Sequence, residues 1–586
     1  MDGRVLLLSV HRLTYDALSL DMEPPGLLIL AAFLETKGYD ALVCQGEPAG
    51  VRAFLAEQAA SGPVLAVGFY CDYENQVEVA ALGAEVHHNY GWPVILGGPQ
   101  VGGLDEAYLR QSCALAAVAG EGEVVLWQLL DCLTGQGGDW RSLEGVIYVD
   151  ETGQLRHNGL APMIQDLDEL PSPAYHRWVN KPFRKKAYVM GGRGCPYNCA
   201  FCHEGSLSRT LRVRSVDKVM ADVETLLALE PHINYIIFAD DTFTVSPQRM
   251  TDFCRRIAKL RESRDFVWYC EGHVKLLYRW PDMMQEMAAA GMVRLQVGIE
   301  SGVQRLLDLY GKKTTLPEIE AVIQAAYEAG VHQMTGFFIN GGPFEDPEIV
   351  AQNKAFCERL LHLAPGMIEL GPSALIPYPE TDIARRPDHY GLRILDRRGW
   401  TSFGDYPVTE TAAMTREAIA KAQRELVEHG IHTMRQLFQA GKIPHQRILD
   451  CFKDLRYGVV SVWHKAVYSE APFVAGYYTL MARDAVRRSA DIAPGELPGW
   501  RPQRIMEMWL DVDFSQGYPR IGREVLSPLE FELLRHSTGK LTLAQVLDRV
   551  YDRFRERFDH REEFDGTAMG LLRGFEKRYW LAYAPF

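Results

Sequence analysis

Short apolar segments alternate with amphipathic ones along the first 150 residues. Apolar runs predict strands at 4–10, 40–44, 64–69, 94–96 and 115–119, and the spacing of apolar residues predicts a helix over 27–37. Strands and helices that alternate in this way form doubly wound α/β sheets. We therefore predict a Rossmann-like domain over residues 1–150, with any ligand at the carboxyl edge of its sheet.

A second alternating series follows a proline-containing linker at 151–182. Apolar residues at helical spacing predict a helix over 216–227, and apolar runs predict strands at 235–239, 266–270, 293–299, 333–339 and 367–375. Polar residues come directly after most of these strands, where a β/α barrel carries its chemistry. With the strand-like run at 187–190, the pattern predicts a β/α barrel over 183–390. The family resemblance described below implies that this barrel has the partial (β/α)6 form.

The last 200 residues have a different pattern. Helical spacing at 411–439, 445–457 and 473–489 predicts a helical extension over 391–495. Residues 496–586 resemble a winged helix or a small peptide-binding module. Both a substrate-holding role and simple closure of the barrel are open for this region.

The charge and the composition of the chain exclude some classes of protein. The 586 residues include 62 Lys and Arg against 76 Asp and Glu, for a net charge of −14. Nucleic acids and anionic membranes attract proteins with an excess of cations, so neither is an expected partner. No apolar stretch has membrane-spanning length and no signal peptide is evident, so we expect a cytoplasmic enzyme.

Three of the eleven cysteines stand apart from the others. Disulfides are improbable in a reducing cytoplasm, and eight scattered cysteines are expected to be small buried hydrophobes. Cys195, Cys199 and Cys202 form a C-x3-C-x2-C array in a glycine-containing loop, where three thiolates can converge. Zinc is an alternative with His203 as fourth ligand, but adjacent residues bind one ion poorly. A four-iron cluster with three cysteine ligands leaves one iron open.

The sequence RGCPYNCAFCH resembles the cluster motif of radical S-adenosylmethionine (SAM) enzymes, and in particular the subgroup that also carries a cobalamin domain. This resemblance implies that Cys195, Cys199 and Cys202 hold a 4Fe-4S cluster. It also implies that SAM chelates the fourth iron and that Phe201 lies beside the adenine.

Downstream segments resemble the same family in their order and spacing. They are FADDTFT, VGIESG, GFFINGGPFE and PYPET. The resemblance implies that Asp240 and Asp241 lie near the methionine part of SAM. It places Glu300 and Ser301 near the ribose and carboxylate, and it places Ile339 and Gly341 near the adenine.

The amino-terminal domain lacks both G-x-G-x-x-G and D-x-H-x-x-G, which disfavours a dinucleotide and a histidine-ligated cobalamin. The segments PPGLLILAAFLETKGYD, GGP and GEGE nevertheless resemble the cobalamin domain of radical SAM methylases. By this resemblance Tyr70 contacts the lower corrin face. The edge and tail of the corrinoid are expected against Gly97, Gly98, Gly120 and Glu121.

Two residues depart from the family pattern. His273 stands where an arginine is common, and Glu271 places a carboxylate two positions earlier. Glu271 could contact the open iron, act as a base near the substrate, or face outward and cap a helix. The first of these would exclude the usual chelation by SAM.

The resemblance implies a cobalamin- and SAM-dependent C-methyltransferase of natural-product biosynthesis, in which the methyl group passes from SAM to cob(I)alamin and then, from methylcobalamin, to carbon. The expected partners are a small-molecule or peptide substrate and a reductant such as flavodoxin or ferredoxin. The specific expectation is methylation of tryptophan at C2, with Glu271 or Tyr310 accepting the ring proton.

Three alternatives stay open at this point. The first is a cobalamin-domain radical SAM enzyme of another type, such as a ring-contracting or cyclising enzyme. The second is a peptide methylase that uses its terminal module as a leader clamp. The third, from a different class, is a corrinoid or iron-sulfur protein that stores or senses its cofactor.

Overall fold

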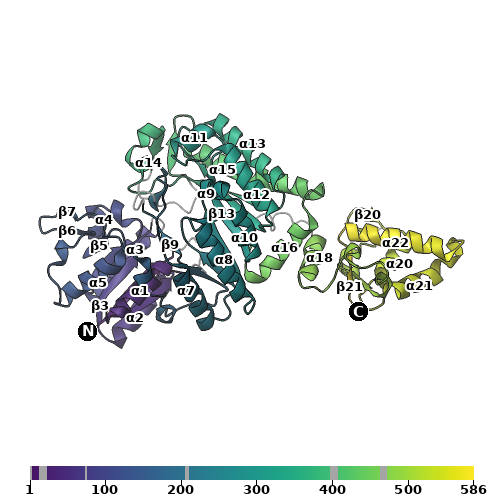
Figure 1. Cartoon of the computed structure of the whole chain (residues 1–586), viewed down its shortest axis with the longest axis horizontal. Helices are drawn as coiled ribbons and strands as arrows, with labels where there is room; N and C mark the ends of the chain where they lie inside the picture. Colours follow the sequence, from purple (N-terminus) through teal and green to yellow (C-terminus); the bar gives the residue numbers. More distant parts are fainter. Residues whose placement is uncertain are drawn as a thin grey trace. The chain divides into compact units, whose positions relative to one another are not determined.

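The structure is a computed structural model that describes residues 3–11, 23–72, 75–204, 210–395, 407–461, 472–515 and 517–585. The chain divides into two compact units, Met1–His432 and Thr433–Phe586 (Figure 1). Among the described residues, no helix combines the length and apolar character needed to cross a membrane.

The amino-terminal domain contains a seven-stranded sheet in the order β2-β1-β3-β4-β5-β6-β7. Its parallel strands are β1 (Arg4–Val10), β2 (Asp40–Gly46), β3 (Val64–Tyr70), β4 (Val94–Gly97) and β5 (Ala116–Val118), and the antiparallel strands are β6 (Val146–Val149) and β7 (Leu155–His157). The helices are α1 (Pro25–Thr36), α2 (Pro48–Ser61), α3 (Gln76–Tyr90), α4 (Glu106–Gln111) and α5 (Gly122–Leu133). The predicted doubly wound fold is confirmed, and the order 2-1-3-4-5 places its ligand crevice at the carboxyl ends of β1 and β3.

Helix α1 begins beside this crevice. Pro25 occupies the first turn, where its fixed φ suits a helix and its missing N–H costs no hydrogen bond. Leu28 and Leu34 are fully buried against the sheet. The start of α1 is therefore fixed at the carboxyl edge of the sheet by local sequence and by packing.

The second sheet has six parallel strands in consecutive spatial order, as the predicted partial barrel requires. They are β8 (Lys186–Val189), β11 (Tyr235–Phe238), β12 (Val267–Gly272), β13 (Met292–Glu300), β14 (Gln333–Asn340) and β15 (Ile368–Ala374). The helices between them are α7 (Val216–Leu229), α8 (Pro247–Arg261), α9 (Val274–Arg279), α10 (Asp282–Ala289), α11 (Gln304–Leu309), α12 (Leu316–Glu328) and α13 (Pro347–Leu363).

Aromatic packing fixes which face of β12 is covered by helices. Trp268 is fully buried and makes an edge contact with Phe253 of α8 at 5.3 Å between ring centroids. Successive side chains of a strand point to opposite faces. Tyr269 and Glu271 therefore point to the other face, the interior of the partial barrel.

After the barrel, β16 (Leu392–Ile394) pairs with β17 (Thr409–Thr411), and α14 (Asp382–Arg385) and α15 (Arg416–Gln439) flank this pair in sequence. The helix that we expected over 411–439 begins at Arg416, because Thr411 belongs to the strand pair. The helix expected over 473–489 is also shorter: α18 (Pro472–Ala482) ends at Ala482.

The second unit has its own hydrophobic core, which includes Leu533, Val546 and Phe564. Its elements are α16 (His445–Asp454), α18, β18 (Arg501–Arg504), α19 (Met508–Asp511), β19 (Arg520–Ile521), β20 (Glu524–Val525), α20 (Pro528–His536), α21 (Leu543–Phe554), α22 (Arg561–Lys577) and β21 (Leu581–Ala584). Strands β18 and β21 pair antiparallel, and so do β19 and β20. The resemblance of 496–586 to a winged helix or peptide-binding module stays a prediction.

Candidate functional site

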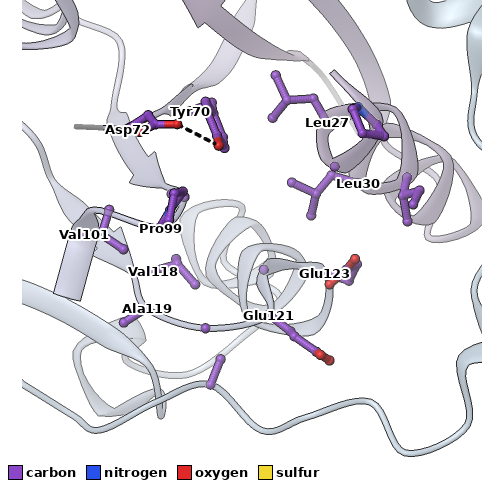
Figure 2. Close-up of a pocket in the computed structure, with 18 of the residues that line it drawn as sticks. Leu27, Leu30, Tyr70, Asp72, Pro99, Val101, Val118, Ala119, Glu121 and Glu123 are labelled. Carbon is purple, nitrogen blue, oxygen red and sulfur yellow. Dashed lines mark hydrogen bonds between the residues drawn. The ribbon is translucent and has the colours of Figure 1, made fainter. Parts of the chain in front are cut away.

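A cavity of about 1100 Å³ lies at the carboxyl edge of the first sheet. Sites for drug-sized ligands usually measure roughly 300–1000 Å³, so this cavity has room for a larger molecule. One side is formed by the ends of β1, β3, β4 and β5 and by α1, from which Leu27 and Leu30 point inward (Figure 2). The other side includes Gly194, His203 and Asp241 of the barrel segment. A single cavity thus touches both α/β domains.

Glycines keep this cavity open. A Cβ atom on Gly97, at the end of β4, would meet no other atom within 4 Å and would occupy open space. Gly98 has φ +112°, and a Cβ atom there would lie 2.6 Å from the carbonyl oxygen of Cys71. The GGP turn therefore combines room for a ligand with a backbone conformation that glycine alone adopts easily.

Tyr70 lines the cavity from the end of β3. Its hydroxyl donates a hydrogen bond to Asp72 at 3.2 Å (Figure 2). Burial, together with the Asp72 carboxylate, raises the pKa of Tyr70 well above its ordinary value. The phenol therefore stays neutral, and it presents an uncharged polar group beside apolar walls.

The GEGE loop forms ion pairs across the cavity wall. Arg212 bonds Glu121 at 2.5 Å, and Arg193 bonds Glu123 at 2.5 Å. The two arginines lie on the short antiparallel strands β9 (Gly192–Arg193) and β10 (Arg212–Val213), which flank the cysteine loop in sequence. Burial opposes ionisation of Glu121, but its bonds to Arg212 hold its pKa below the ordinary value. Glu121 thus both lines the cavity and joins the first domain to the strand pair that flanks the cysteine loop.

The cysteine loop is fixed by the barrel strands beneath it. The backbone N–H of Gly191 donates to Asp240 at 2.6 Å, directly before the loop begins. Cys195 lies 3.6 Å from the Thr242 hydroxyl, and Ala200 donates its N–H to the Tyr310 carbonyl at 2.8 Å. Burial raises the pKa of Asp240 to about 7. Asp240, a predicted SAM contact, is thus the anchor of the loop.

The three cysteines of the loop are a donor set that is compatible with an iron-sulfur cluster. Cys195 and Cys199 are buried, and Cys202 is partly exposed. A single zinc ion needs its ligands around one point, at about 2.3 Å for sulfur. Within the part of the chain that the structure describes, no three His, Cys, Asp or Glu side chains are arranged in that way. Three thiolates on a four-iron cluster each bind a different iron, so this spacing is compatible with a cluster.

The predicted SAM contacts that follow β13 and β14 make bonds within the protein. Glu300 accepts a hydrogen bond from the Lys312 ammonium at 2.6 Å, and the Ser301 hydroxyl donates to Asn353 at 2.9 Å. The Gly341 N–H donates to Glu345 at 3.0 Å. These bonds orient the strand ends, whether or not the same residues also contact a ligand.

Tyr310 lies in a hydrophobic cluster with Phe201 and Ile339. Its side chain is 1% exposed, and its hydroxyl would lie 2.1 Å from a Cβ atom on Gly342. Burial raises its pKa well above the ordinary value of a tyrosine. In this position Tyr310 packs the cysteine loop against the barrel, and it does not line the cavity.

Glu271 belongs to a hydrogen-bonded group inside the barrel. The Gln296 amide donates to Glu271 Oε1 at 2.7 Å, and the Tyr269 hydroxyl lies 3.1 Å from the same oxygen and 2.7 Å from Gln296 Oε1. Burial raises the pKa of Glu271 to about 7. A carboxyl group that ionises near neutral pH suits proton transfer.

His273 directly follows the same strand, β12, and precedes α9. Its ring stacks on Tyr197 at 3.6 Å with 11° between the planes, and its Nδ1 accepts the N–H of Lys275 as the cap of α9. Burial and the cations Lys312 and Lys275 lower its pKa to about 2. His273 is therefore neutral and does not replace the charge of the arginine that is common in the family.

The structure thus separates the predicted site residues into two groups. The first group lines the cavity and comprises Tyr70, Gly97, Gly98, Gly120, Glu121 and Asp241. The second group lies in the cysteine loop, or on and directly after the barrel strands and α11. It comprises Cys195, Cys199, Cys202, Phe201, Asp240, Glu271, Glu300, Ser301, Tyr310, Ile339 and Gly341. Four further residues of the site were not predicted from the sequence: Arg193, Arg212, Gln296 and Lys312. Strand alternation was a usable signal for Gln296, because it is the β13 partner of Glu271.

Comparison with known families identifies the second α/β domain. The match to the radical SAM superfamily covers residues 189–355, which include the cysteine loop and the strands from β11 to β14. These residues form a radical SAM domain. The chain also aligns at 31% identity over 288 residues with an uncharacterized methyltransferase of Pyrococcus horikoshii. That alignment covers 48% of this chain and 61% of the relative, so the chain spans less than two thirds of the relative's length.

Solved structures share the fold well beyond the radical SAM domain. The methyltransferase TsrM of Kitasatospora setae, with cobalamin and a [4Fe-4S] cluster bound, matches with a TM-score of 0.58 at 18% identity, over 82% of this chain and 100% of that chain. The cobalamin-dependent radical enzyme OxsB, with aqua-cobalamin and SAM bound, matches with a TM-score of 0.59 at 15% identity, over 98% and 80%. These likenesses show a shared fold that includes the first sheet and the barrel.

Proposed function

We propose that the protein is a cobalamin- and SAM-dependent C-methyltransferase. The observation that carries this proposal is the cavity itself, because one space of about 1100 Å³ is lined both by the carboxyl edge of the first sheet and by residues of the radical SAM domain. A methyl carrier held on the first sheet would face the cysteine loop across this space. The similarity of this chain to methyltransferases supports the same function.

The residues present fit the cofactors that this function needs. Gly97 and Gly98 leave room for a large flat ligand beside Tyr70, and Cys195, Cys199 and Cys202 are the thiols for a cluster. When bound, cobalamin supplies a methyl carrier, SAM the methyl group, and the cluster a one-electron donor. We also propose a cytoplasmic location and a reductant of the flavodoxin or ferredoxin type, which would supply the electron that the cluster donates.

We propose an aromatic amino acid, tryptophan in particular, as the substrate class. TsrM has been solved with tryptophan substrate and a SAM analogue bound, with a TM-score of 0.55 to this chain at 19% identity. Methylation of an indole carbon releases a ring proton, and Glu271 is our candidate acceptor because it faces the barrel interior and ionises near neutral pH. Tyr310 is the weaker candidate, because its hydroxyl is enclosed by the hydrophobic cluster.

The test is anaerobic purification with iron, sulfide and cobalamin quantified, followed by incubation with methyl-labelled SAM and tryptophan or other aromatic compounds. The proposal expects bound iron and cobalamin and label in a carbon-methylated product. Turnover of SAM with no label in any product would instead favour another radical reaction. Release of neither S-adenosylhomocysteine nor 5′-deoxyadenosine would favour a cofactor-storing or sensing protein.

A further inference from the structure

A buried ion pair lies beneath the cysteine loop. The ammonium of Lys312, in the turn after α11, donates to Glu300 at 2.6 Å, and the two side chains are 9% and 7% exposed. Buried charges are costly unless they are paired, and even a paired one is a weak source of stability. A lysine and a glutamate at such a position therefore need an explanation beyond packing.

The pair lies against the segment that carries the cysteines. The Lys312 ammonium is 5.9 Å from the centre of the Phe201 ring, between Cys199 and Cys202 in sequence, and it interacts electrostatically with both thiols. The adjoining backbone is bonded to the loop, because Ala200 donates its N–H to the Tyr310 carbonyl. Lys312 is thus held at a fixed place relative to the thiols.

The local backbone is shaped to admit this pair. Glu300 adopts φ +65°, in the left-handed region that non-glycine residues rarely occupy. A Cβ atom on Gly298 would lie 2.0 Å from Glu300 Oε1 and 2.4 Å from the Lys312 ammonium. The glycine therefore leaves the volume into which both charged groups fit.

Two other cationic side chains, Arg193 and Lys313, have surroundings that differ from those of Lys312. Arg193 is engaged by Glu123 at 2.5 Å, in the contact with the first domain. Lys313, the next residue after Lys312, is exposed. Lys312 is therefore the buried cation of this turn, and its exposed neighbour provides a matched control.

We propose that Lys312 and Glu300 together set the reduction potential of the cluster held by Cys195, Cys199 and Cys202. This inference rests on the proposed function, since it requires the cluster. Reduction adds one electron from an external reductant to the cluster and breaks no bond. A fixed positive charge nearby favours the added negative charge, and a fixed negative charge opposes it. Lys312 therefore raises the potential, and Glu300 limits that rise.

A charge series in the holoenzyme tests this proposal. Lys312→Met removes the cation, Glu300→Gln removes the anion, and the double variant Glu300→Gln/Lys312→Met restores the net charge of the wild-type pair. Lys312→Arg keeps the cation, and Lys313→Met is the control. The measurement is an EPR-monitored titration with dithionite in the absence of SAM, after iron and sulfide have been quantified for each variant.

The expected result is a graded shift. Lys312→Met makes reduction about tenfold less favourable, which is about 59 mV for a one-electron couple, and Glu300→Gln shifts it by a similar factor in the opposite direction. The double variant, Lys312→Arg and Lys313→Met stay within about threefold of wild type, or about 28 mV. If Lys312→Met alone fails to fold, the return of the potential from the Glu300→Gln value to the wild-type value in the double variant still tests the contribution of Lys312.

Two outcomes would overturn the inference while leaving the proposed function intact. One is a wild-type potential in both single variants that retain the cluster. The other is a shift in the same direction for Lys312→Met and Glu300→Gln, which indicates structural perturbation. A wild-type protein that binds no cluster would instead refute the proposed function itself.

Discussion

At the scale of single residues, Glu271 has the most specific chemical environment. Its Oε1 accepts from Gln296, and burial raises its pKa to about 7. A base must be ionised to act, so we expect kcat/KM for methyl transfer to rise with pH through about 7. Glu271→Gln should lose this rise and lower the rate by about 10²–10⁴-fold, the usual contribution of a general base. Labelled product measured between pH 5.5 and 8.5 checks both effects.

Gln296→Leu is the companion variant for this measurement. It removes a hydrogen bond that favours the ionised carboxylate, so the midpoint of the pH profile should move to higher pH while the base itself stays in place. An unchanged pH profile in Glu271→Gln would contradict the role of Glu271 as the base.

The three clustered cysteines make the second prediction at this scale. Cys195→Ala, Cys199→Ala and Cys202→Ala should each reduce bound iron to less than about a tenth of wild type, because a cluster needs all its thiolates. Cys254→Ala, on α8, removes a buried thiol outside the loop and should leave iron unchanged. Iron and sulfide analysis with the visible absorbance of the anaerobic protein gives the answer, and an intact spectrum in the loop variants would exclude the assignment.

At the scale of elements, the carboxyl end of β4 defines the space for a ligand. Gly97→Leu places a side chain in the open space of the cavity, so we expect cobalamin affinity to fall by about tenfold or more. Bound iron should stay at the wild-type level, because the cysteine loop is not altered. The measurement is cobalamin bound at equilibrium to the purified protein.

Gly50→Leu is the matched control for this substitution. Gly50 lies on an exposed face of α2, and a Cβ atom there also meets nothing within 4 Å. The same change of residue therefore alters the surface and leaves the cavity unchanged. Equal cobalamin binding by the Gly97 and Gly50 variants would show that the ligand does not use the edge at β4.

The elements themselves were largely predictable from the sequence. Strand β11 is a continuous apolar run, and β1 is mostly apolar; such runs are expected where both faces of a parallel sheet are buried. The start of α15 was not predictable in this way, because pairing of Thr411 with β16 overrides its helical spacing. Long-range pairing leaves no local periodicity in the sequence.

The motifs of the candidate site could be predicted from the sequence, but most of the contacts between its side chains could not. The cysteine array is a local pattern, whereas the bond between Glu121 and Arg212 joins residues 91 positions apart. The Glu300 and Lys312 pair depends on a left-handed backbone at Glu300 and on the glycine at 298, which no hydrophobic pattern encodes. The family resemblance placed Glu300 beside a ligand, and the structure shows it bonded to a lysine.

At the scale of the whole molecule, several buried carboxyl groups couple folding to pH. Burial raises the pKa of Glu23, Asp240 and Glu345 to about 7 each. Unfolded chains bind these protons only below about pH 4.5. The folded first unit therefore holds protons that the unfolded chain releases. Because each raised pKa stabilises the folded state at low pH, the contribution to the free energy of unfolding decreases as pH rises from about 4.5 to above 7.

Glu345 allows this coupling to be isolated in the full-length protein. Its side chain is 1% exposed and accepts the N–H of Gly341, so Glu345→Gln keeps the acceptor and removes the titration. Between pH 5.5 and pH 8 the wild type should lose about 2 kcal/mol more unfolding free energy than the variant, as expected for a pKa raised from 4.5 to about 7. Urea unfolding of both proteins at the two pH values measures the difference. Parallel pH dependence in the two proteins would show that Glu345 ionises at its ordinary pKa, and that the glycine turn after β14 is open to water.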